Sequence, residues 1–354
     1  MKKFRDISIN NFKGFKDFEL KNLKKFNFIV GDNNVGKSSF LEAAVVSEDF
    51  YKTAAALTQI SAYRQKMPEN SVGFDSYYSK FNEIRCFDIE KIDYNGVRSK
   101  INIRKYNYNE LLNNEELQNK LLTEKAFEKV VSSKESVFDA TDYDVYSVNG
   151  SNIELLSKYV RRGGYIPFIH SGFSFSNDLV TYYSRFILDT NSNYKVLEED
   201  IRNVFADFEA FRVLSREKDR PEILVDMRDG CKNLSLSDMG DGFVKVLRYY
   251  LEMYFDKECP LFIDEIDNGI YYRNLKKFWP MFFNTAKRFN NQIFATTHSK
   301  ECISSLVDYL KLNPELKDDF QVLNFRLNNK GNPFAVIYNF EELDLAIELG
   351  NEFR

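Results

Sequence analysis

The sequence predicts an α/β protein with a mostly parallel core sheet, an antiparallel β-layer and a helical insertion. Three observations predict this class. Near the start, an apolar run at residues 26–30 passes through a glycine-containing loop into a helical pattern. In the second half, short apolar strands alternate with amphipathic helices, which is typical of a parallel sheet. Between these regions, Asn95-Gly96 joins two strand-like runs, and this dipeptide favours a tight β-hairpin.

The first half of the chain is expected to supply the antiparallel layer and the insertion. In chain order we expect two short strands within 1–20, a strand at 26–30, a helix from 37 to about 56, a strand pair at 83–93 and 97–106, a charged helix at 113–131, and strand and loop at 138–149. We interpret residues 65–164 as an accessory β and helical insertion within a single domain that spans residues 1–354.

The second half is expected to supply most of the parallel core. In chain order we expect a strand at 165–169, mostly helix at 178–214, a strand at 223–226, a polar loop at 234–242, a helix at 241–255, a strand at 261–263, a helix at 275–289, a strand at 292–295, and a tail with a helix at 302–310, strands at 320–325 and 334–338 and a last short helix. No heptad pattern runs for three or four repeats, so no long coiled-coil arm is expected.

Composition narrows the class of function. At 44% hydrophobic residues the chain can bury a sizeable core, and its net charge of −4 gives no overall nucleic-acid footprint. Residues 1–28 contain eight Lys or Arg against three acids, which we interpret as a solvated face rather than a DNA-binding patch. The cysteines form no C-x-x-C pair, so neither a zinc site nor a disulfide framework is indicated. Without an apolar run of roughly 18 residues or a signal segment, we expect a cytoplasmic protein and no membrane partner.

One motif near the start points to phosphate chemistry. Gly31-Asp32-Asn33-Asn34-Val35-Gly36-Lys37-Ser38 fits G-x-x-x-x-G-K-[ST] and lies between an expected strand and an expected helix. Glycine lets the backbone N–H groups point at phosphate oxygens, and the helix directs the positive end of its dipole at the same anion. Lys37 would reach the β- and γ-phosphates, and the Ser38 hydroxyl would reach Mg²⁺. The nucleotide-binding candidates are Gly31, Asn33, Asn34, Gly36, Lys37, Ser38 and Ser39. The alternative is an Asn/Gly-rich turn.

A second motif supplies two carboxylates. The apolar strand at 260–263 ends in Asp264 and Glu265. Asp264 would hold Mg²⁺, and Glu265 would polarise the water that attacks the phosphate. The alternative is a strand that simply ends in acids, and the phosphate loop favours the catalytic interpretation.

Two further stretches complete the candidate site. His298 follows a buried strand within Thr296-Thr297-His298-Ser299, at the strand end where ligands gather in open α/β sheets. It is a candidate γ-phosphate sensor, and the alternative is a histidine satisfied in the core. In the loop at 234–242, Ser237 and the N–H groups near Gly240 could bind a second face of the phosphates. The alternative there is an N-capped helix after a loop. His170, also at a strand end, is interpreted as structural.

The order of these four elements resembles that of the ABC-type ATPases, and most of all their AAA15 and OLD-like branch. The likeness lies in Asn11-Phe12-Lys13-Gly14-Phe15 and in residues 264–269 and 292–299, whereas about 47–164 carries almost none of it. The loop at 234–242 takes the place of the family's signature loop, and its sequence departs from Leu-Ser-Gly-Gly-Gln. The chain has Gly269-Ile270-Tyr271 where relatives often have histidine after Gly-Leu, and no glutamine can be placed as a Q-loop residue.

The resemblance implies a P-loop NTPase fold of ABC-ATPase type and hydrolysis of ATP with Mg²⁺. It implies a homo-oligomer, at least a dimer with ATP at the interface, in which Ser237 and Gly240 act in trans. OLD-like relatives often carry a TOPRIM nuclease, for which the stretch after Ser299 leaves no room, so we expect a separate effector protein. The chain resembles stand-alone ATPase subunits of phage-defence systems, PARIS-type systems among them. A sensor or switch role in anti-phage defence is therefore expected.

Other classes of function remain alternatives. A RecF-like or SMC-like DNA-binding ATPase in repair or maintenance has the same motif order, although the missing coiled coil argues against SMC. A scaffold that binds nucleotide without hydrolysis is disfavoured by Glu265. A GTPase is disfavoured because Asn329-Lys330-Gly331-Asn332 lacks the final acid of a guanine-binding motif.

Overall fold

The computed structural model describes residues 1–65, 75–78, 85–121, 143–149, 152–155, 167–172, 177–190, 194–214 and 222–350. The chain divides into two compact units. The first consists of Met1–Leu23, Gly31–Phe168 and Asn324–Val336. The second consists of Lys24–Val30, Ile169–Leu323 and Ile337–Arg354.

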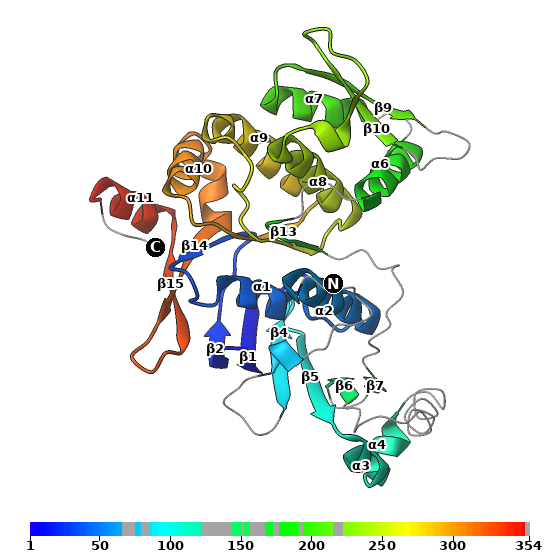
Figure 1. Ribbon diagram of the computed structural model, residues 1–354. Coiled ribbons are helices and arrows are strands. Elements are labelled where there is room, and N and C mark those ends of the chain that lie inside the picture. Colours follow the sequence, from blue (N-terminus) through cyan, green and yellow to red (C-terminus); the bar gives the residue numbers. More distant parts are fainter. Residues whose placement is uncertain are drawn as a thin grey trace. The chain divides into compact units, whose positions relative to one another are not determined.

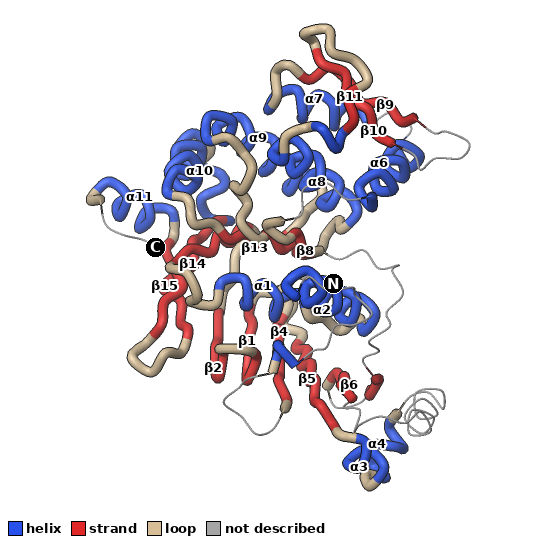
Figure 2. The backbone as a smooth tube through the Cα atoms, viewed as in Figure 1, coloured by secondary structure: helices blue, strands red, loops and turns tan. Residues whose placement is uncertain are grey.

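An antiparallel sheet forms the framework of the first unit (Figure 2, red). Its six strands, in spatial order, are β2 (Phe15–Leu20), β1 (Asp6–Phe12), β4 (Cys86–Ile92), β5 (Arg98–Tyr106), β6 (Tyr143–Val148) and β7 (Asn152–Leu155). Ile9 of β1 pairs with Ile89 of β4, and both side chains are buried. The strands expected to belong to the insertion therefore continue the sheet that the N-terminal hairpin begins.

The predicted hairpin at Asn95-Gly96 is confirmed, and the reason is local. The Asp93 carboxylate accepts hydrogen bonds from the N–H groups of Asn95 (2.8 Å) and Val97 (2.9 Å). Gly96 has φ 81°, in the left-handed region that a residue with a side chain rarely adopts. An Asx-type turn of this kind sets the register of β4 against β5.

The helix expected from 37 to about 56 is two helices, α1 (Lys37–Val45) and α2 (Phe50–Gln65). The backbone turns extended at Val46, and buried side chains satisfy the polar groups that this break exposes. The Lys91 ammonium donates to the carbonyl oxygens of Ala44 and Val46. The Thr53 hydroxyl accepts from the Ser47 N–H at 2.9 Å and donates to the Ser47 carbonyl at 3.0 Å. Because these bonds come from outside α1, the helical pattern alone could not reveal the break.

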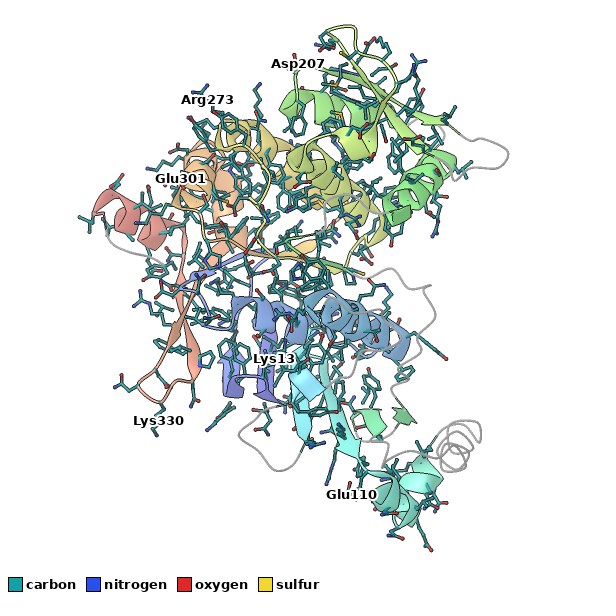
Figure 3. The ribbon with its side chains drawn as sticks, in the orientation of Figure 1. Lys13, Glu110, Asp207, Arg273, Glu301 and Lys330 are labelled. Carbon is teal, nitrogen blue, oxygen red and sulfur yellow. The ribbon has the colours of Figure 1, made fainter. Side chains whose placement is uncertain are left out.

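Among its described residues, the first unit has three further short helical elements: η2 (Asp75–Tyr77), α3 (Tyr108–Leu112) and α4 (Glu115–Lys120). Of the charged helix predicted at 113–131, α4 is the described part, and residues 122–142 lie outside the described residues. Two ion pairs anchor α1 in this unit, because the buried Glu42 carboxylate contacts both Lys13 and Arg64 (Lys13 is labelled in Figure 3).

The second sheet contains the predicted parallel core (Figure 1). Its strand order is β15 (Pro333–Tyr338), β14 (Phe320–Leu327), β3 (Phe26–Gly31), β13 (Gln292–Thr296), β12 (Pro260–Ile263) and β8 (Phe168–Ile169). β13 pairs in parallel with β3 (Phe28 opposite Ala295) and with β12 (Phe262 opposite Phe294). The carboxyl ends of β12 and β13 therefore lie side by side.

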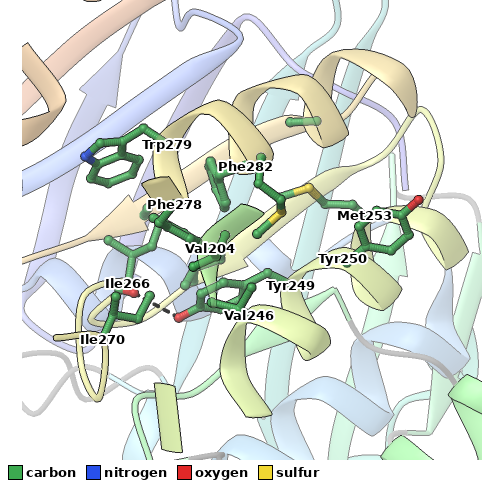
Figure 4. Packing of buried hydrophobic residues seen from close by; sticks show 14 of the residues in the cluster. Val204, Val246, Tyr249, Tyr250, Met253, Ile266, Ile270, Phe278, Trp279 and Phe282 are labelled. Atoms are coloured by element: carbon green, nitrogen blue, oxygen red, sulfur yellow. Dashed lines mark hydrogen bonds between the residues drawn. The ribbon is translucent and has the colours of Figure 1, made fainter. Parts of the chain in front are cut away.

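Helices of the second unit carry the rest of its core. They are α6 (Asn177–Thr190), α7 (Tyr194–Val204), α8 (Asp241–Phe255), α9 (Tyr272–Arg288), α10 (Lys300–Leu312), η4 (Pro314–Asp319) and α11 (Phe340–Glu348). Large aromatic side chains of α8 and α9 pack together, with Tyr249 of α8 and Phe278 of α9 at 5.9 Å between ring centroids (Figure 4). The Tyr249 hydroxyl of α8 donates to the Ile266 carbonyl at 3.0 Å (Figure 4, dashed line), which ties α8 to the loop after β12.

The expectation of mostly helix at 178–214 is wrong for its last part. Residues 208–214 form β9 (Phe208–Leu214) in a small antiparallel sheet with β10 (Glu222–Met227) and β11 (Leu234–Ser235). Phe211 pairs with Val225, and its ring packs against Phe243 of α8 at 5.9 Å. Pairing with β10 and this aromatic packing outweigh the local helical pattern. The polar loop expected at 234–242 also contains β11 and a short 3₁₀ turn, η3 (Leu236–Asp238).

Among the helices of the described residues, none has the length and apolar content that crossing a membrane requires. Cys86, Cys231, Cys259 and Cys302 are free thiols.

Candidate active site

The phosphate loop of the first unit has a backbone that only glycine fits at two positions. Gly31 has φ 137°, and a Cβ there would overlap the carbonyl oxygen of Phe325. Gly36 has φ 103°, and a Cβ there would lie 3.1 Å from the Phe15 ring. Asn34 also adopts positive φ, at 65°. The chain folds here into the tight curve that the motif predicts.

Lys37 lies against the inside of this curve. Its side chain is buried, and its Nζ donates to the carbonyl oxygens of Gly31 (2.8 Å) and Asp32 (2.6 Å). Gly36 is the N-cap of α1, no side chain caps the helix start, and its first turn contains no acid. The positive end of the helix dipole is therefore directed at the loop without a protein carboxylate to compensate it, as anion binding requires. Ser38 and Ser39 are half-buried in this first turn.

In the second unit, the two acids at the end of β12 share one partner. Asp264 is buried, and its Oδ1 accepts a 2.7 Å hydrogen bond from the Thr296 hydroxyl. The same hydroxyl accepts the Glu265 N–H at 2.8 Å, and the Thr296 carbonyl accepts the Ile266 N–H at 3.0 Å. The Thr296 side chain, at the end of β13, thus orients the Asp264 carboxylate and hydrogen-bonds the backbone of Glu265.

Glu265 has a backbone in the left-handed region, with φ 52°. A glutamate there stores strain that the surrounding structure must support, and such residues gather at functional sites. Its Oε2 lies 3.4 Å from the Asn268 amide nitrogen, which also donates to the Ser171 carbonyl at 3.2 Å.

Lys245 of α8 is a buried cation in the same region. Its Nζ donates to the Ser171 carbonyl at 2.6 Å. Burial lowers the pKa of Lys245, and the nearby carboxylates of Asp241, Glu265, Asp267 and Asp264 act in the opposite direction.

His298 lies at the carboxyl end of β13, as its position in the sequence predicts, and is exposed. The residues on either side of it, Thr297 and Ser299, are held by hydrogen bonds. The Thr297 hydroxyl donates to Asp267 at 2.6 Å and accepts the Ser299 N–H at 3.0 Å. The Ser299 hydroxyl accepts the Cys302 N–H at 3.0 Å and so caps α10. The imidazole is therefore carried on a fixed backbone.

The signature loop is open at its tip. Gly240 is the N-cap of α8, no side chain caps this helix, and a Cβ on Gly240 would meet nothing within 4 Å. Ser237 is exposed and its Oγ lies 2.8 Å from the Ser235 Oγ. Two residues on, the packing is tight: a Cβ on Gly242 would overlap the carbonyl oxygen of Gly269. The start of α8 therefore rests on the loop that follows Glu265.

Residues 26–304 match the family model described as "AAA domain, putative AbiEii toxin, Type IV TA system". The chain belongs to this AAA family. It is an ATPase, so the predicted hydrolysis of ATP is confirmed.

Two proteins with similar sequences bear on this AAA ATPase. A Helicobacter pylori protein named "ATP/GTP phosphatase" is 22% identical over 326 residues, covering 85% of this chain and 87% of that protein. An uncharacterised Methanocaldococcus jannaschii protein is 35% identical over 82 residues, which is 22% of this chain and 37% of that protein.

Solved structures give the fold of the AAA ATPase. A crystal structure of an Smc head bound to the C-terminal winged-helix domain of ScpA has a TM-score of 0.56 at 12% identity, covering 96% of this chain and 98% of that one. An Smc head with an extended coiled coil, bound to a ScpA domain derived from Pyrococcus furiosus, has a TM-score of 0.55 at 12% identity and covers 99% of each chain. The predicted P-loop NTPase fold of ABC-ATPase type is confirmed.

The candidate residues of the AAA ATPase divide between the units. The phosphate-loop residues belong to the first unit, whereas Ser237, Gly240, Asp264, Glu265 and His298 belong to the second. Within the part of the chain that the structure describes, no three His, Cys, Asp or Glu side chains converge on a metal position. Mg²⁺ needs no such cluster, because it is commonly held by one or two protein oxygens and the substrate phosphates. A Ser38 hydroxyl and an Asp264 carboxylate are oxygen donors of the kind that it prefers.

Four residues of the second unit were not predicted to support the site: Thr296, Lys245, Asn268 and Gly242, which packs against Gly269. One signal was available for Lys245, a charged residue between Val244 and Val246 in a largely apolar helical stretch. Another was available for Thr296, a hydroxyl at the end of the strand that neighbours the acidic one. Asn268 and Gly242 owe their roles to contacts that no local pattern announces.

Proposed function

We propose that this ATPase binds Mg²⁺ and ATP between two copies of the chain, and that dimerisation driven by ATP controls a separate effector protein. The observation that carries the proposal is the open, uncapped start of α8. Gly240 and Ser237 offer N–H and hydroxyl donors at an exposed helix start, while Gly242 holds this start against the loop after Glu265. A helix start that faces solvent is suited to cap a nucleotide carried by another molecule.

We propose one role for each candidate residue. Lys37 neutralises the β- and γ-phosphates, Ser38 and Asp264 hold Mg²⁺, and Glu265 takes a proton from the attacking water. Bound Mg²⁺ would withdraw charge from the phosphate oxygens. His298 contacts the γ-phosphate, and its fixed backbone lets it respond to the loss of that group. Ser237 and Gly240 complete the site in trans.

The test is the assembly state of Glu265→Gln. This variant keeps the shape of the side chain and loses the base, so ATP should stay bound and the dimer should accumulate. Light scattering with and without ATP measures it, and Lys37→Ala serves as the control that should stay monomeric. A monomeric Glu265→Gln in saturating ATP would contradict the proposal.

A DNA-binding ATPase of RecF or SMC type is the second candidate, because two solved structures that share this fold are Smc heads. The charges of the first unit do not favour it. Three of the basic residues near the N-terminus are paired with acids: Arg5 with Asp6 (3.0 Å), Lys13 with Glu42, and Lys21 with Glu19 (2.9 Å). On the sheet, Arg98 of β5 pairs with Glu90 of β4 at 3.1 Å. Salt-dependent binding of duplex DNA would favour this candidate instead.

We infer membership in the AAA15 and OLD-like branch and a role in anti-phage defence from the motif order and from the family, whose description includes a putative toxin of a toxin–antitoxin system. Pull-down of the tagged chain from its native cells, with and without ATP, would identify the effector. Plating of phage on cells that carry wild-type or Lys37→Ala protein together with that effector tests the defence role. Equal plating on both would contradict it.

A further inference from the structure

Lys245 is a charged side chain in a part of α8 that is buried. It is 2% exposed, and its neighbours along the helix are buried hydrophobic residues. A buried ammonium is costly unless it is hydrogen-bonded, and here it donates to the Ser171 carbonyl at 2.6 Å. Ser171 follows β8, the edge strand beside the acidic strand β12. The Lys245 ammonium therefore holds the Ser171 carbonyl group in place.

The Ser171 carbonyl also accepts a hydrogen bond from Asn268, at 3.2 Å. The same Asn268 nitrogen lies 3.4 Å from Oε2 of Glu265. An amide nitrogen has two hydrogens, and these two acceptors use both, so the orientation of the Asn268 amide is set. A continuous series of contacts thus runs from Lys245 through the Ser171 carbonyl and the Asn268 amide to the Glu265 carboxylate.

The charges around Lys245 agree with this arrangement. The carboxylates of Asp241, Asp264, Glu265 and Asp267 all act on the ammonium. Their charges favour the protonated form of Lys245, which is the form that donates to the Ser171 carbonyl.

We propose that Lys245 and Asn268 are positioning residues for Glu265. Lys245 fixes the Ser171 carbonyl, this carbonyl orients the Asn268 amide, and the amide holds Oε2 of Glu265, so that Oε1 accepts the proton of the attacking water. In that step the water oxygen bonds to the γ-phosphorus, the bond from this phosphorus to the bridging oxygen breaks, and ADP leaves. The proposal rests on the proposed role of Glu265 as the base.

The experiment compares kcat and the apparent KM for ATP in paired variants. Lys245→Met keeps the length of the side chain and removes its charge, whereas Lys245→Arg keeps the charge and can still donate. We expect Lys245→Met and Asn268→Ala each to lower kcat about ten-fold or more with little change in KM, as a share of the roughly 10²–10⁴-fold that a base contributes. Lys245→Arg should recover much of the loss. Lys276→Met, an exposed lysine of α9, is the control and should turn over like wild type.

Double variants separate positioning from mere packing. If the residues act in series, Lys245→Met with Asn268→Ala should lose no more activity than either change alone. In a Glu265→Gln background, neither change should lower the residual turnover further, because the carboxylate that they position is gone. An equal loss in that background, or additive losses in the double variant, would overturn the proposal.

Two other outcomes are decisive. Should Lys245→Met fail to fold, Asn268→Ala at its exposed position carries the test, and wild-type kcat in that folded variant would overturn the proposal. Should Glu265→Gln itself turn over like wild type, the proposed function would lose its base. That result is distinct from a normal Glu265→Gln defect with no effect of Lys245→Met, which overturns the positioning role alone.

Discussion

The hydroxyl of Thr296 donates a 2.7 Å hydrogen bond to the carboxylate of Asp264, from the end of one parallel strand to the end of the next. Since the same hydroxyl accepts the Glu265 N–H, one oxygen atom of a neighbouring strand supports both acids. Loss of this hydroxyl would leave a buried carboxylate oxygen and a backbone N–H without that partner.

Thr296→Val removes the hydroxyl and keeps the shape of the side chain. With two hydrogen bonds worth about 1 kcal/mol each, we expect kcat to fall roughly ten-fold or more and the Mg²⁺ requirement to rise. Turnover measured against Mg²⁺ concentration checks this. Thr296→Ser retains the hydroxyl and should stay near wild type; equal losses in both variants would place the effect in packing.

The trans arrangement is tested by mixing two inactive variants. Gly240→Arg should fold normally, because nothing lies within 4 Å of a Cβ at this position, and should block the approach of α8 to a nucleotide. Lys37→Ala damages the phosphate loop instead. Mixed dimers would each regain one intact site, so turnover should rise clearly above either variant, up to about a quarter of wild type. No gain despite demonstrated subunit exchange would contradict action in trans.

Alanine substitutions at Gly242 and Gly240 can be compared by their effect on the free energy of unfolding. Gly242→Ala places a Cβ against the Gly269 carbonyl, and overpacking of this kind typically costs about 1–3 kcal/mol. The free energy of unfolding and the turnover should both fall. Gly240→Ala, where the space is open, should change stability far less. Denaturant titration of the two variants compares them directly, and similar midpoints would contradict the tight contact.

Because Lys91 is buried, the free energy of unfolding should depend on pH. Burial lowers the pKa of Lys91 from 10.5 to about 7, although the charge of Glu48 opposes the shift. Between about pH 7 and 10.5 the unfolded chain holds this proton and the folded chain does not, so raising the pH should stabilise the fold by an amount on the order of a few kcal/mol. Below pH 7 the cost of burying the charge is constant.

Lys91→Met removes this contribution. The free energy of unfolding of wild type relative to Lys91→Met should therefore rise from pH 7 to pH 10 in denaturant titrations. Lys100→Met, an exposed lysine of the neighbouring strand β5, is the control and should show no such trend relative to wild type. A constant difference between wild type and Lys91→Met would contradict the shifted pKa.

The parts of the fold that the sequence predicted are those whose causes are local. The phosphate loop, β12 and β13 are each announced by an apolar run with a polar or glycine-containing end. The parts that were missed depend on partners far along the chain. The break after α1 is satisfied by Lys91, 45 residues beyond Val46, and β9 needs its pairing with β10.

The same distinction holds for the candidate site. Lys37, Asp264 and His298 stand in motifs, and the structure places each at the loop or strand end that its motif predicts. The support of the acids could not be predicted, because the Thr296 hydroxyl meets the Glu265 N–H from 31 residues away and Lys245 meets Ser171 from 74. These contacts exist only once β12, β13 and α8 have packed.

The sheet of the first unit has a practical consequence for anyone who seeks a minimal version of this enzyme. β1 is bonded on one side to β2 and on the other to β4, so the middle of the chain supplies half of the partners of the N-terminal strand. A shortened protein that lacks β4 to β7 would present the bare backbone of β1 to water. The unpaired N–H and C=O groups of such an edge can bond to strands of other molecules, which favours aggregation. The middle segment is therefore a poor target for deletion, and changes in its loops are the safer route to a smaller enzyme.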